Sequence, residues 1–334
     1  MFKYCLLLFA LMTAPLAADE TGSSLPDMEK IVKSHILPGL EDLARTAEDL
    51  AQSVAQTCPD NPDAVKEAYG KAFDAWVRVS HLRFGPSETD DRAYALAFWP
   101  DTKGFTPKTL QRLLQDRDPA IESVDGFKAV SIAARGFYPL EFLLYDPQFV
   151  EHPSPNRCQL MRVMTQDIAA NALAIRDDWK DGYGSRLISA DNETYRSHEE
   201  AIRQVYTALT TALLFTSDTR LGRPMGSFTK PRPARAEARR SGRSLRHVIL
   251  SLEANRELAS LLSQGDEDID QGFERAIRIA NELDDPDLSG VATIQGRIRA
   301  EALQGAISFV NDLLAEYLAP RLGITAGFNA LDGD

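Results

Sequence analysis

The sequence lacks a long apolar run, has few cysteines and histidines, and shows little strand-like alternation. The apolar stretch at residues 6–11 is far shorter than the roughly 20 residues of a membrane-spanning helix, so no transmembrane anchor is expected. Only five histidines occur, and no two of them are four positions apart, which removes the usual helical pattern of a zinc protease. Helical periodicity dominates instead, and the sequence predicts an all-α protein.

The charge balance excludes another class of function. The chain of 334 residues has a formal net charge of −12, which argues against nucleic acid or an anionic membrane surface as a partner. The segment from Arg220 to Arg246 is an exception, because it is rich in basic residues. Its basic residues are Arg220, Arg223, Lys230, Arg232, Arg235, Arg239, Arg240, Arg243 and Arg246, with Asp218 and Glu237 as the nearby acids.

The N-terminus has the pattern of an export signal. Lys3 precedes the apolar residues 6–11, and the small residues of Leu16-Ala17-Ala18 come before Asp19. We therefore expect residues 1–18 to be a signal peptide and the mature chain to be soluble in the periplasm or cell envelope. Cys5 precedes the apolar run and is not placed to carry a lipid at the cleavage point.

Export would leave two cysteines, Cys58 and Cys158, in an oxidising compartment. The sequence predicts a disulfide between them. By closing a loop of about 100 residues, this disulfide would stabilise the folded chain by on the order of 4 to 5 kcal/mol in the chain-entropy model. The alternative is two free cysteines on unrelated surfaces.

Apolar residues at three- and four-residue spacing predict a series of amphipathic helices. A Pro-rich link at residues 146–155 suggests two helical bundles packed side by side, with domains at residues 19–150 and 151–334. A Gly/Pro/Arg-rich crossover follows at residues 221–241. The helices are expected at residues 28–56 with a kink at Pro38, and at 63–83, 125–145, 156–179, 193–217, 242–263, 267–284 and 288–322.

The most informative segment is RGFYPLEFLLYD, which starts at Arg135 and places a phenol and a carboxylate three residues apart. On a helix, positions i and i+3 share a face, so Tyr138 and Glu141 are expected to point toward one ligand. Pro139 lies between them and lacks a backbone N–H. Two interpretations stay open: a helix interrupted at Pro139, or a helix that begins near Tyr138 with Pro139 in its first turn.

The same segment resembles the signature of the imelysin family, also classed as peptidase family M75, which reads G-x-H-x-x-E before an apolar helix. Gly136 and Glu141 stand at the glycine and glutamate positions, whereas Tyr138 replaces the histidine. The resemblance implies a duplicated helical-bundle fold, a site between the bundles and a role in iron-regulated uptake. Further similar segments are FGPSETDDRAYALAFWPD from Phe84, LGRPMGSF from Leu221, EARRSGRSLR from Glu237 and the C-terminal LGITAGFNALDGD.

Three interpretations are open for Tyr138 and Glu141. Phenolate and carboxylate oxygens suit ferric iron, and tyrosine is an axial ligand in some haem proteins, so the pair is a candidate for an iron or haem site. The second interpretation is a metal-dependent peptidase or other hydrolase with Glu141 as general base. The loss of the motif histidine favours binding over peptidase activity. The third is a structural pair, in which Tyr138 bonds Glu141 or a nearby arginine.

An anionic ligand is also expected, because the guanidinium groups of the arginines between Arg220 and Arg246 can each donate two hydrogen bonds to a carboxylate. The predicted ligand is a small molecule, a metal complex or an anion such as a siderophore or haem propionates, with outer-membrane or periplasmic uptake proteins as partners. Arg92 is expected to neutralise Glu141, and Trp99 to offer either a stacking surface or core packing. The predicted cleft comprises Arg83, Arg92, Trp99, Asp101, Gly136, Tyr138, Glu141, Arg239, Ser241, Arg243 and Ser244.

Overall fold

The computed structural model describes residues 25–58, 60–115, 118–151 and 155–324. Within these ranges the chain is helical, and its β contacts are limited to two isolated bridges. The predicted all-α class is therefore confirmed. No helix in the described ranges combines the length and apolar character needed to cross a membrane. The predicted export signal at residues 1–18 lies outside the described residues.

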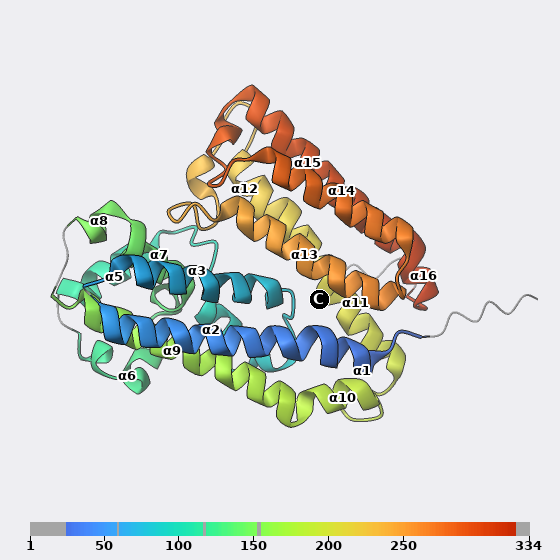
Figure 1. Ribbon diagram of the computed structural model, residues 1–334, viewed down its shortest axis with the longest axis horizontal. Coiled ribbons are helices and arrows are strands. Elements are labelled where there is room, and N and C mark those ends of the chain that lie inside the picture. Colours follow the sequence, from blue (N-terminus) through green and yellow to red (C-terminus); the bar gives the residue numbers. More distant parts are fainter. Residues whose placement is uncertain (1–24, 59, 116–117, 152–154, 325–334) are drawn as a thin grey trace, which may run out of the picture.

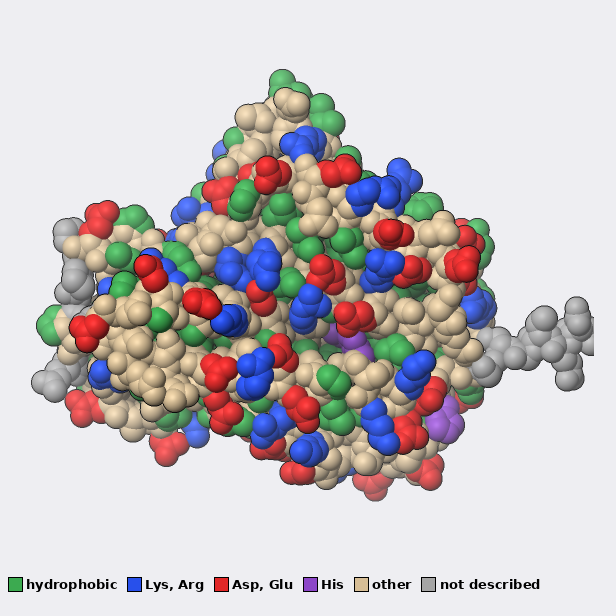
Figure 2. All heavy atoms as spheres, viewed as in Figure 1, with side chains coloured by type: hydrophobic (Ala, Val, Ile, Leu, Met, Phe, Trp, Pro, Cys, Tyr) green, Lys and Arg blue, Asp and Glu red, His purple; other side chains and the backbone are tan. Residues whose placement is uncertain are grey.

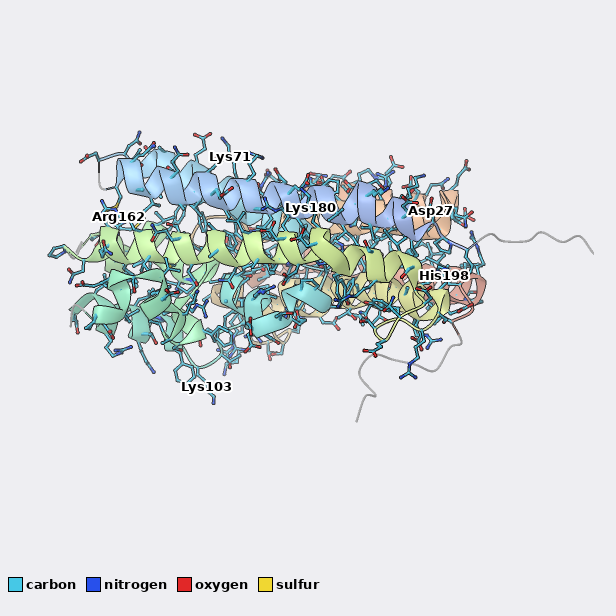
Figure 3. The ribbon with its side chains drawn as sticks, turned by 90° about the horizontal axis from the view of Figure 1, so that it is seen from below. Asp27, Lys71, Lys103, Arg162, Lys180 and His198 are labelled. Carbon is cyan, nitrogen blue, oxygen red and sulfur yellow. A yellow bond between two sulfur atoms is a disulfide. The ribbon has the colours of Figure 1, made fainter. Side chains whose placement is uncertain are left out.

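The first part of the chain forms a group of helices around α2, α3 and α9, which we call the first helix group (Figure 1). α2 packs against both α3 and α9, and α4 to α7 contact α9. Figure 3 shows α2 and α9 running side by side. The bounds are α1 Met28–Ile31, α2 Leu37–Thr57, α3 Pro62–Val79, α4 Arg92–Leu96, α5 Phe105–Gln115, α6 Val124–Lys128, α7 Phe137–Tyr145, α8 Pro147–Val150 and α9 Arg157–Asp178.

The later helices form the second helix group, in which α13 contacts α11 and α14, and α15 contacts α11 and α14. α13 also packs against α3 and thereby joins the two groups (Figure 1). α9 follows the predicted domain boundary near residue 150 but packs along α2. The bounds are α10 Gly184–Ser189, α11 His198–Leu214, α12 Gly222–Met225, α13 Ser244–Ser263, α14 Glu267–Leu283, α15 Ile294–Leu313 and α16 Ala319–Arg321.

The kink expected at Pro38 takes the form of a π-helical turn, Val32–Ile36, between α1 and α2. Proline has no N–H to donate and crowds the carbonyl of the preceding turn. The wider turn accommodates this, and the N–H of Leu37 bonds the carbonyl of Val32. π-Helical turns are frequent at functional sites. This one carries His35, whose side chain is buried.

The segment at residues 125–145 is not the single helix that its periodicity predicts. α6 ends at Lys128, a short 3₁₀ turn follows at Ile132–Ala134, and α7 begins at Phe137 after Gly136. Pro139 therefore lies in the first turn of α7. The interpretation as a helix that begins near Tyr138 is correct, and the interruption at Pro139 is wrong.

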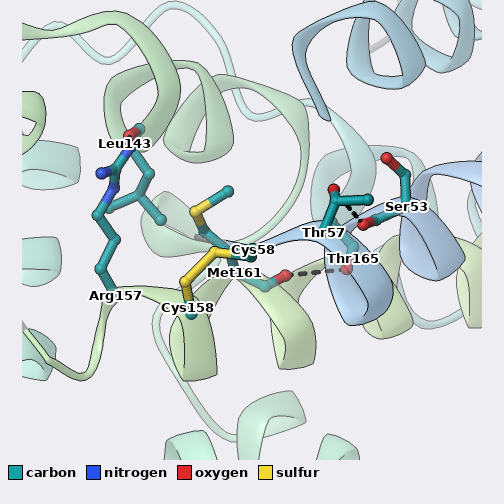
Figure 4. Close-up of a disulfide and its surroundings, with 8 residues drawn as sticks. All are labelled: Ser53, Thr57, Cys58, Leu143, Arg157, Cys158, Met161 and Thr165. Carbon is teal, nitrogen blue, oxygen red and sulfur yellow. Dashed lines mark hydrogen bonds between the residues drawn. A yellow bond between two sulfur atoms is a disulfide. The ribbon is translucent and has the colours of Figure 1, made fainter. Parts of the chain in front are cut away.

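The predicted disulfide between Cys58 and Cys158 is confirmed, with 5.9 Å between the two Cα atoms. Cys58 directly follows α2, and Cys158 lies in the first turn of α9. Figure 4 shows the bridge beside Met161. The disulfide joins the ends of two helices that also pack against each other along their length.

Candidate functional site

Gly136 is required by the backbone at the start of α7. Its φ angle of +85° lies in the left-handed region, and it forms an antiparallel bridge with Ala97. A Cβ at this position would lie 2.1 Å from the carbonyl oxygen of Leu96. Only glycine fits such an approach. The contact places the segment that leads to Trp99 beside the first turn of α7.

Tyr138 is buried and donates a hydrogen bond from its hydroxyl to Glu237 Oε1. Arg220 Nε donates to the other oxygen of Glu237 at 2.7 Å, and His247 Nδ1 lies 3.3 Å from that oxygen. Burial alone would raise the pKa of Glu237, but Arg220, His247 and the Tyr138 hydroxyl lower this pKa to about 2. Glu237 is thus a buried carboxylate held in its charged form.

Tyr138 itself stays neutral. Burial and the adjacent charge of Glu237 raise its pKa well above the usual value for tyrosine. The hydroxyl therefore acts as a hydrogen-bond donor to a carboxylate. This arrangement disfavours the phenolate form that a ferric ligand would need.

Glu141 accepts its hydrogen bonds from Ser241 in the crossover and not from Tyr138 or Arg220. The backbone N–H of Ser241 lies 2.9 Å from Glu141 Oε1, and the Ser241 hydroxyl lies 2.7 Å from the same oxygen. Glu141 is only 2% exposed. Burial raises its pKa, and the two donors of Ser241 offset this only in part. Tyr138 and Glu141 thus have separate partners.

The arginines next to Ser241 tie the crossover to the first helix group. Arg240 Nε donates to Asp146 at 2.6 Å, and its guanidinium lies 3.6 Å from the centre of the Phe142 ring. Arg243 pairs with Asp74 and donates to the carbonyl of Gly70 at 2.9 Å. These contacts hold Ser241 in position against Glu141.

Two other predicted residues of this segment have different surroundings. The hydroxyl of Ser244 donates to the backbone carbonyl of Glu237, which fixes the segment before α13. Arg239 Nε is buried and makes no hydrogen bond within the described part of the chain. Within the described part of the chain, neither side chain forms a hydrogen bond with Glu141, whose donors are both in Ser241.

A cavity of about 550 Å³ lies between the first helix group and α11, and we call it the aromatic cavity. Its volume is in the range of small-molecule sites. Trp99 and Tyr138 stack with ring centres 6.2 Å apart, and Phe215 meets Trp99 edge-on at 6.0 Å. Glu141 is not among the lining residues. The cavity's lining residues include Arg83, Trp99, Tyr138, Phe215, Arg220 and Glu237.

Comparison with known proteins identifies the family. The sequence profile described as Imelysin matches residues 36–314. The chain belongs to the imelysin family. A search of curated proteins found no match to this imelysin-family chain. The resemblance drawn from the sequence segments is thereby confirmed.

Two solved structures share the imelysin fold. An imelysin-like protein from Psychrobacter arcticum 273-4 is 16% identical, with a TM-score of 0.68 over 90% of this chain and 96% of that chain. A "putative iron-regulated protein A precursor" from Parabacteroides distasonis ATCC 8503 is 13% identical, with a TM-score of 0.68 over 85% and 93% of the two chains. At these identities the likeness shows the fold alone.

Two residues predicted for the cleft of this imelysin-family chain lie elsewhere. Arg92 does not reach Glu141, because its guanidinium pairs with Asp178 at 2.5 Å and donates to the carbonyl of Pro86. Asp101 accepts the backbone N–H of Thr106 at 2.8 Å in the first turn of α5. Both side chains are held by partners within the first helix group, and the prediction that Arg92 neutralises Glu141 is wrong.

The candidate site also contains residues that the motif did not indicate. Glu237 lies in the crossover, Arg220 lies in the π-helical turn Phe215–Leu221 just before it, and His247 lies on α13 with its ring 4.4 Å from that of Phe73. The sequence showed Glu237 only as an isolated acid in a basic segment. His247 carried no local signal. In the described residues, no group of three or more histidine, cysteine, aspartate or glutamate side chains converges as it could around a metal ion.

Proposed function

We propose that this imelysin-family chain is an exported binding protein of the periplasm or cell envelope that takes part in iron or haem acquisition. The observation that carries the proposal is the aromatic cavity, whose lining includes the rings of Trp99, Tyr138 and Phe215 and the charged Arg220–Glu237 pair. The relative from Parabacteroides distasonis is described as iron-regulated, which supports a role related to iron.

The cavity favours an iron complex over a bare ferric ion. Tyr138 is a neutral donor bound to Glu237, and Glu141 is bound to Ser241, so these oxygens already have partners. Aromatic faces instead suit a flat organic ligand, such as haem or an aromatic chelate. Arg83 also lines the cavity, with its guanidinium 4.6 Å from the centre of the Tyr94 ring and paired with Glu88 at 2.6 Å, so a ligand carboxylate would compete with Glu88 for this arginine.

A titration tests this function. Protein purified from the periplasm is titrated separately with haem and with a ferric aromatic chelate, and binding is followed by the ligand absorbance and by tryptophan fluorescence. We expect saturable binding that weakens at least about tenfold in Trp99→Ala, because a stacking face is worth roughly 1–3 kcal/mol. Phe309→Ala, at an exposed position on α15 outside the cavity, should bind as the parent does.

The absence of saturable binding to either probe would contradict the proposal. Equal affinity in the Trp99 variant and the parent would place the ligand outside the aromatic cavity. These two outcomes separate the proposed function from its proposed location. Variants are compared only where circular dichroism shows the parental helix content.

A hydrolase that uses Glu141 as general base is the second candidate. Its supporting observation is the raised pKa of Glu141, which is a property of carboxyl groups that act as bases near neutral pH. However, Glu141 is buried, accepts two hydrogen bonds from Ser241 and does not line the aromatic cavity. Zinc-dependent peptide cleavage that disappears in Glu141→Gln would favour this candidate over binding.

A further inference from the structure

Two histidines that are 46 positions apart in the sequence meet inside the first helix group. His35 Nε2 lies 3.0 Å from His81 Nε2, and both side chains are buried. His35 is presented by the π-helical turn before α2, and His81 follows the end of α3. Neither histidine belongs to the imelysin motif or contacts Glu141.

The other nitrogen of each ring faces an acceptor. His35 Nδ1 lies 3.5 Å from Glu257 Oε2 on α13, and His81 is hydrogen-bonded to the backbone carbonyl of Arg78. These acceptors favour a proton on each Nδ1. Both Nε2 atoms then carry lone pairs, and the two lone pairs face each other. A positive charge between them would remove this repulsion.

We propose that His35 and His81 form a two-histidine site for a borderline transition-metal ion such as Zn²⁺, Cu²⁺ or Ni²⁺. Two nitrogens that each lie about 2.1 Å from one metal ion are about 3.0 to 3.4 Å apart, which matches the observed separation of the Nε2 atoms. Metal-binding imidazoles commonly donate their remaining N–H to a carboxylate or a backbone carbonyl. Glu257 and the carbonyl of Arg78 occupy these two positions.

The chemistry of the pair suits this group of metals. Imidazole nitrogen binds zinc, copper and nickel readily. No third histidine, cysteine or carboxylate converges on the pair among the described residues, so water or an added ligand would fill the remaining positions.

A surface groove reaches His35, one of the two proposed ligands. It has a volume of about 650 Å³, and we call it the His35 groove; its charged lining residues are Arg78, Glu253, Arg256, Glu257 and Asp270. Its three carboxylates and two arginines give the groove a small net negative charge, which favours the entry of a cation. Figure 2 shows acidic and basic side chains gathered where the first helix group meets α13. His81 lines the aromatic cavity on the other side.

Metal titration tests the proposal. The mature protein is titrated with Zn²⁺, Ni²⁺ and Cu²⁺ in a non-coordinating buffer near pH 7.5, and heat and bound metal are measured. We expect one equivalent to bind, with affinity at least tenfold weaker in His35→Asn and in His81→Asn. Nitrogen splitting in the copper electron paramagnetic resonance spectrum should show two imidazoles. His198→Asn, at an exposed position labelled in Figure 3, is the matched control.

A third variant tests the site without removing a buried side chain, so that weaker metal binding cannot be due to unfolding. Glu257→Gln changes a half-exposed side chain, keeps the shape of residue 257 and removes the charge beside His35 Nδ1. We expect affinity to fall about 10- to 100-fold, as for other groups that orient a metal-bound histidine. Glu48→Gln on the exposed face of α2 should have no effect.

Unchanged metal binding in the His35, His81 and Glu257 variants would overturn the proposal. A copper spectrum without two histidine nitrogens would also overturn it, because the pair would then share only a proton. These measurements use metal ions alone, so their outcome is independent of haem or chelate binding in the aromatic cavity.

Discussion

Glu141 and Glu237 are two buried carboxylates at the same junction between the helix groups, and their pKa values shift in opposite directions. Glu237 has an arginine, a histidine and a tyrosine hydroxyl as partners, and its pKa falls to about 2. Glu141 has the N–H and hydroxyl of Ser241, and its pKa rises. Both are almost fully buried, so burial does not explain the difference.

The difference shows what a buried carboxylate needs in order to stay charged. Desolvation disfavours the charged form of both groups. At Glu237 the guanidinium of Arg220 lies within 2.7 Å and outweighs this cost. At Glu141 the nearest arginine, Arg240, is paired with Asp146 and acts only from a distance. One site therefore holds a fixed charge, and the other holds a carboxyl that gains a proton more readily.

Removal of Arg220 should have the largest effect. Arg220→Met leaves Glu237 charged and buried without its main partner, so we expect the free energy of unfolding to fall by about 3–5 kcal/mol. Urea unfolding near pH 7 measures this change. Arg203→Met, at an exposed position on α11, is the matched control and should change stability by less than about 0.5 kcal/mol.

The double variant with Glu237→Gln separates charge from packing. If the loss comes from an uncompensated carboxylate, the double variant should recover part of the stability that Arg220→Met loses. A double variant that is no more stable than the single one would show that Arg220 acts through packing. The comparison between the two carboxylates would then lose its electrostatic basis.

The pH dependence of Glu237 should have the next largest effect. Its pKa is lowered from 4.5 to about 2 in the folded chain. It therefore contributes stability that is present above pH 4.5 and is lost as the pH falls toward 2, about 3 kcal/mol in full. The stability difference between the parent and Glu237→Gln should shrink from pH 5 to pH 3. A difference that does not vary with pH would contradict the lowered pKa.

The sequence predicted what depends on local spacing. Three-and-four periodicity located the long helices, and export chemistry predicted the bridge between Cys58 and Cys158. Tyr138 and Glu141 were expected to share a ligand because they are three residues apart. Their partners, Glu237 and Ser241, come from a crossover about 100 positions away. Spacing on one helix does not determine which distant groups its side chains meet.

The same limit explains the helix predicted at residues 125–145. Its periodicity is continuous, but α6 ends at Lys128 and α7 begins only at Phe137, directly after Gly136, whose backbone pairs with Ala97. His35 and His81 are a similar case, since each is isolated in the sequence and only the packing of the π-helical turn against the end of α3 brings them together. Both features depend on contacts between segments that periodicity does not report.

Glu141→Gln should have the smallest effect, and its sign should be opposite. A carboxyl whose folded pKa is raised contributes stability below the unfolded pKa near 4.5, and this contribution is lost as the pH rises through the folded pKa. The variant lacks that loss, so its stability relative to the parent should increase from pH 4 to pH 8. Urea unfolding at several pH values measures the change, which we expect to stay within about 1 kcal/mol.

Glu41→Gln on the exposed face of α2 controls for general effects of charge removal. A loss of several kcal/mol in Glu141→Gln near pH 7 would mean that Glu141, like Glu237, depends on a charged partner. The two carboxylates would then be alike. If the stability of Glu141→Gln relative to the parent rises with pH, the uncharged Ser241 tolerates a protonated Glu141. In the protonated state Glu141 is least able to act as a metal ligand or a base.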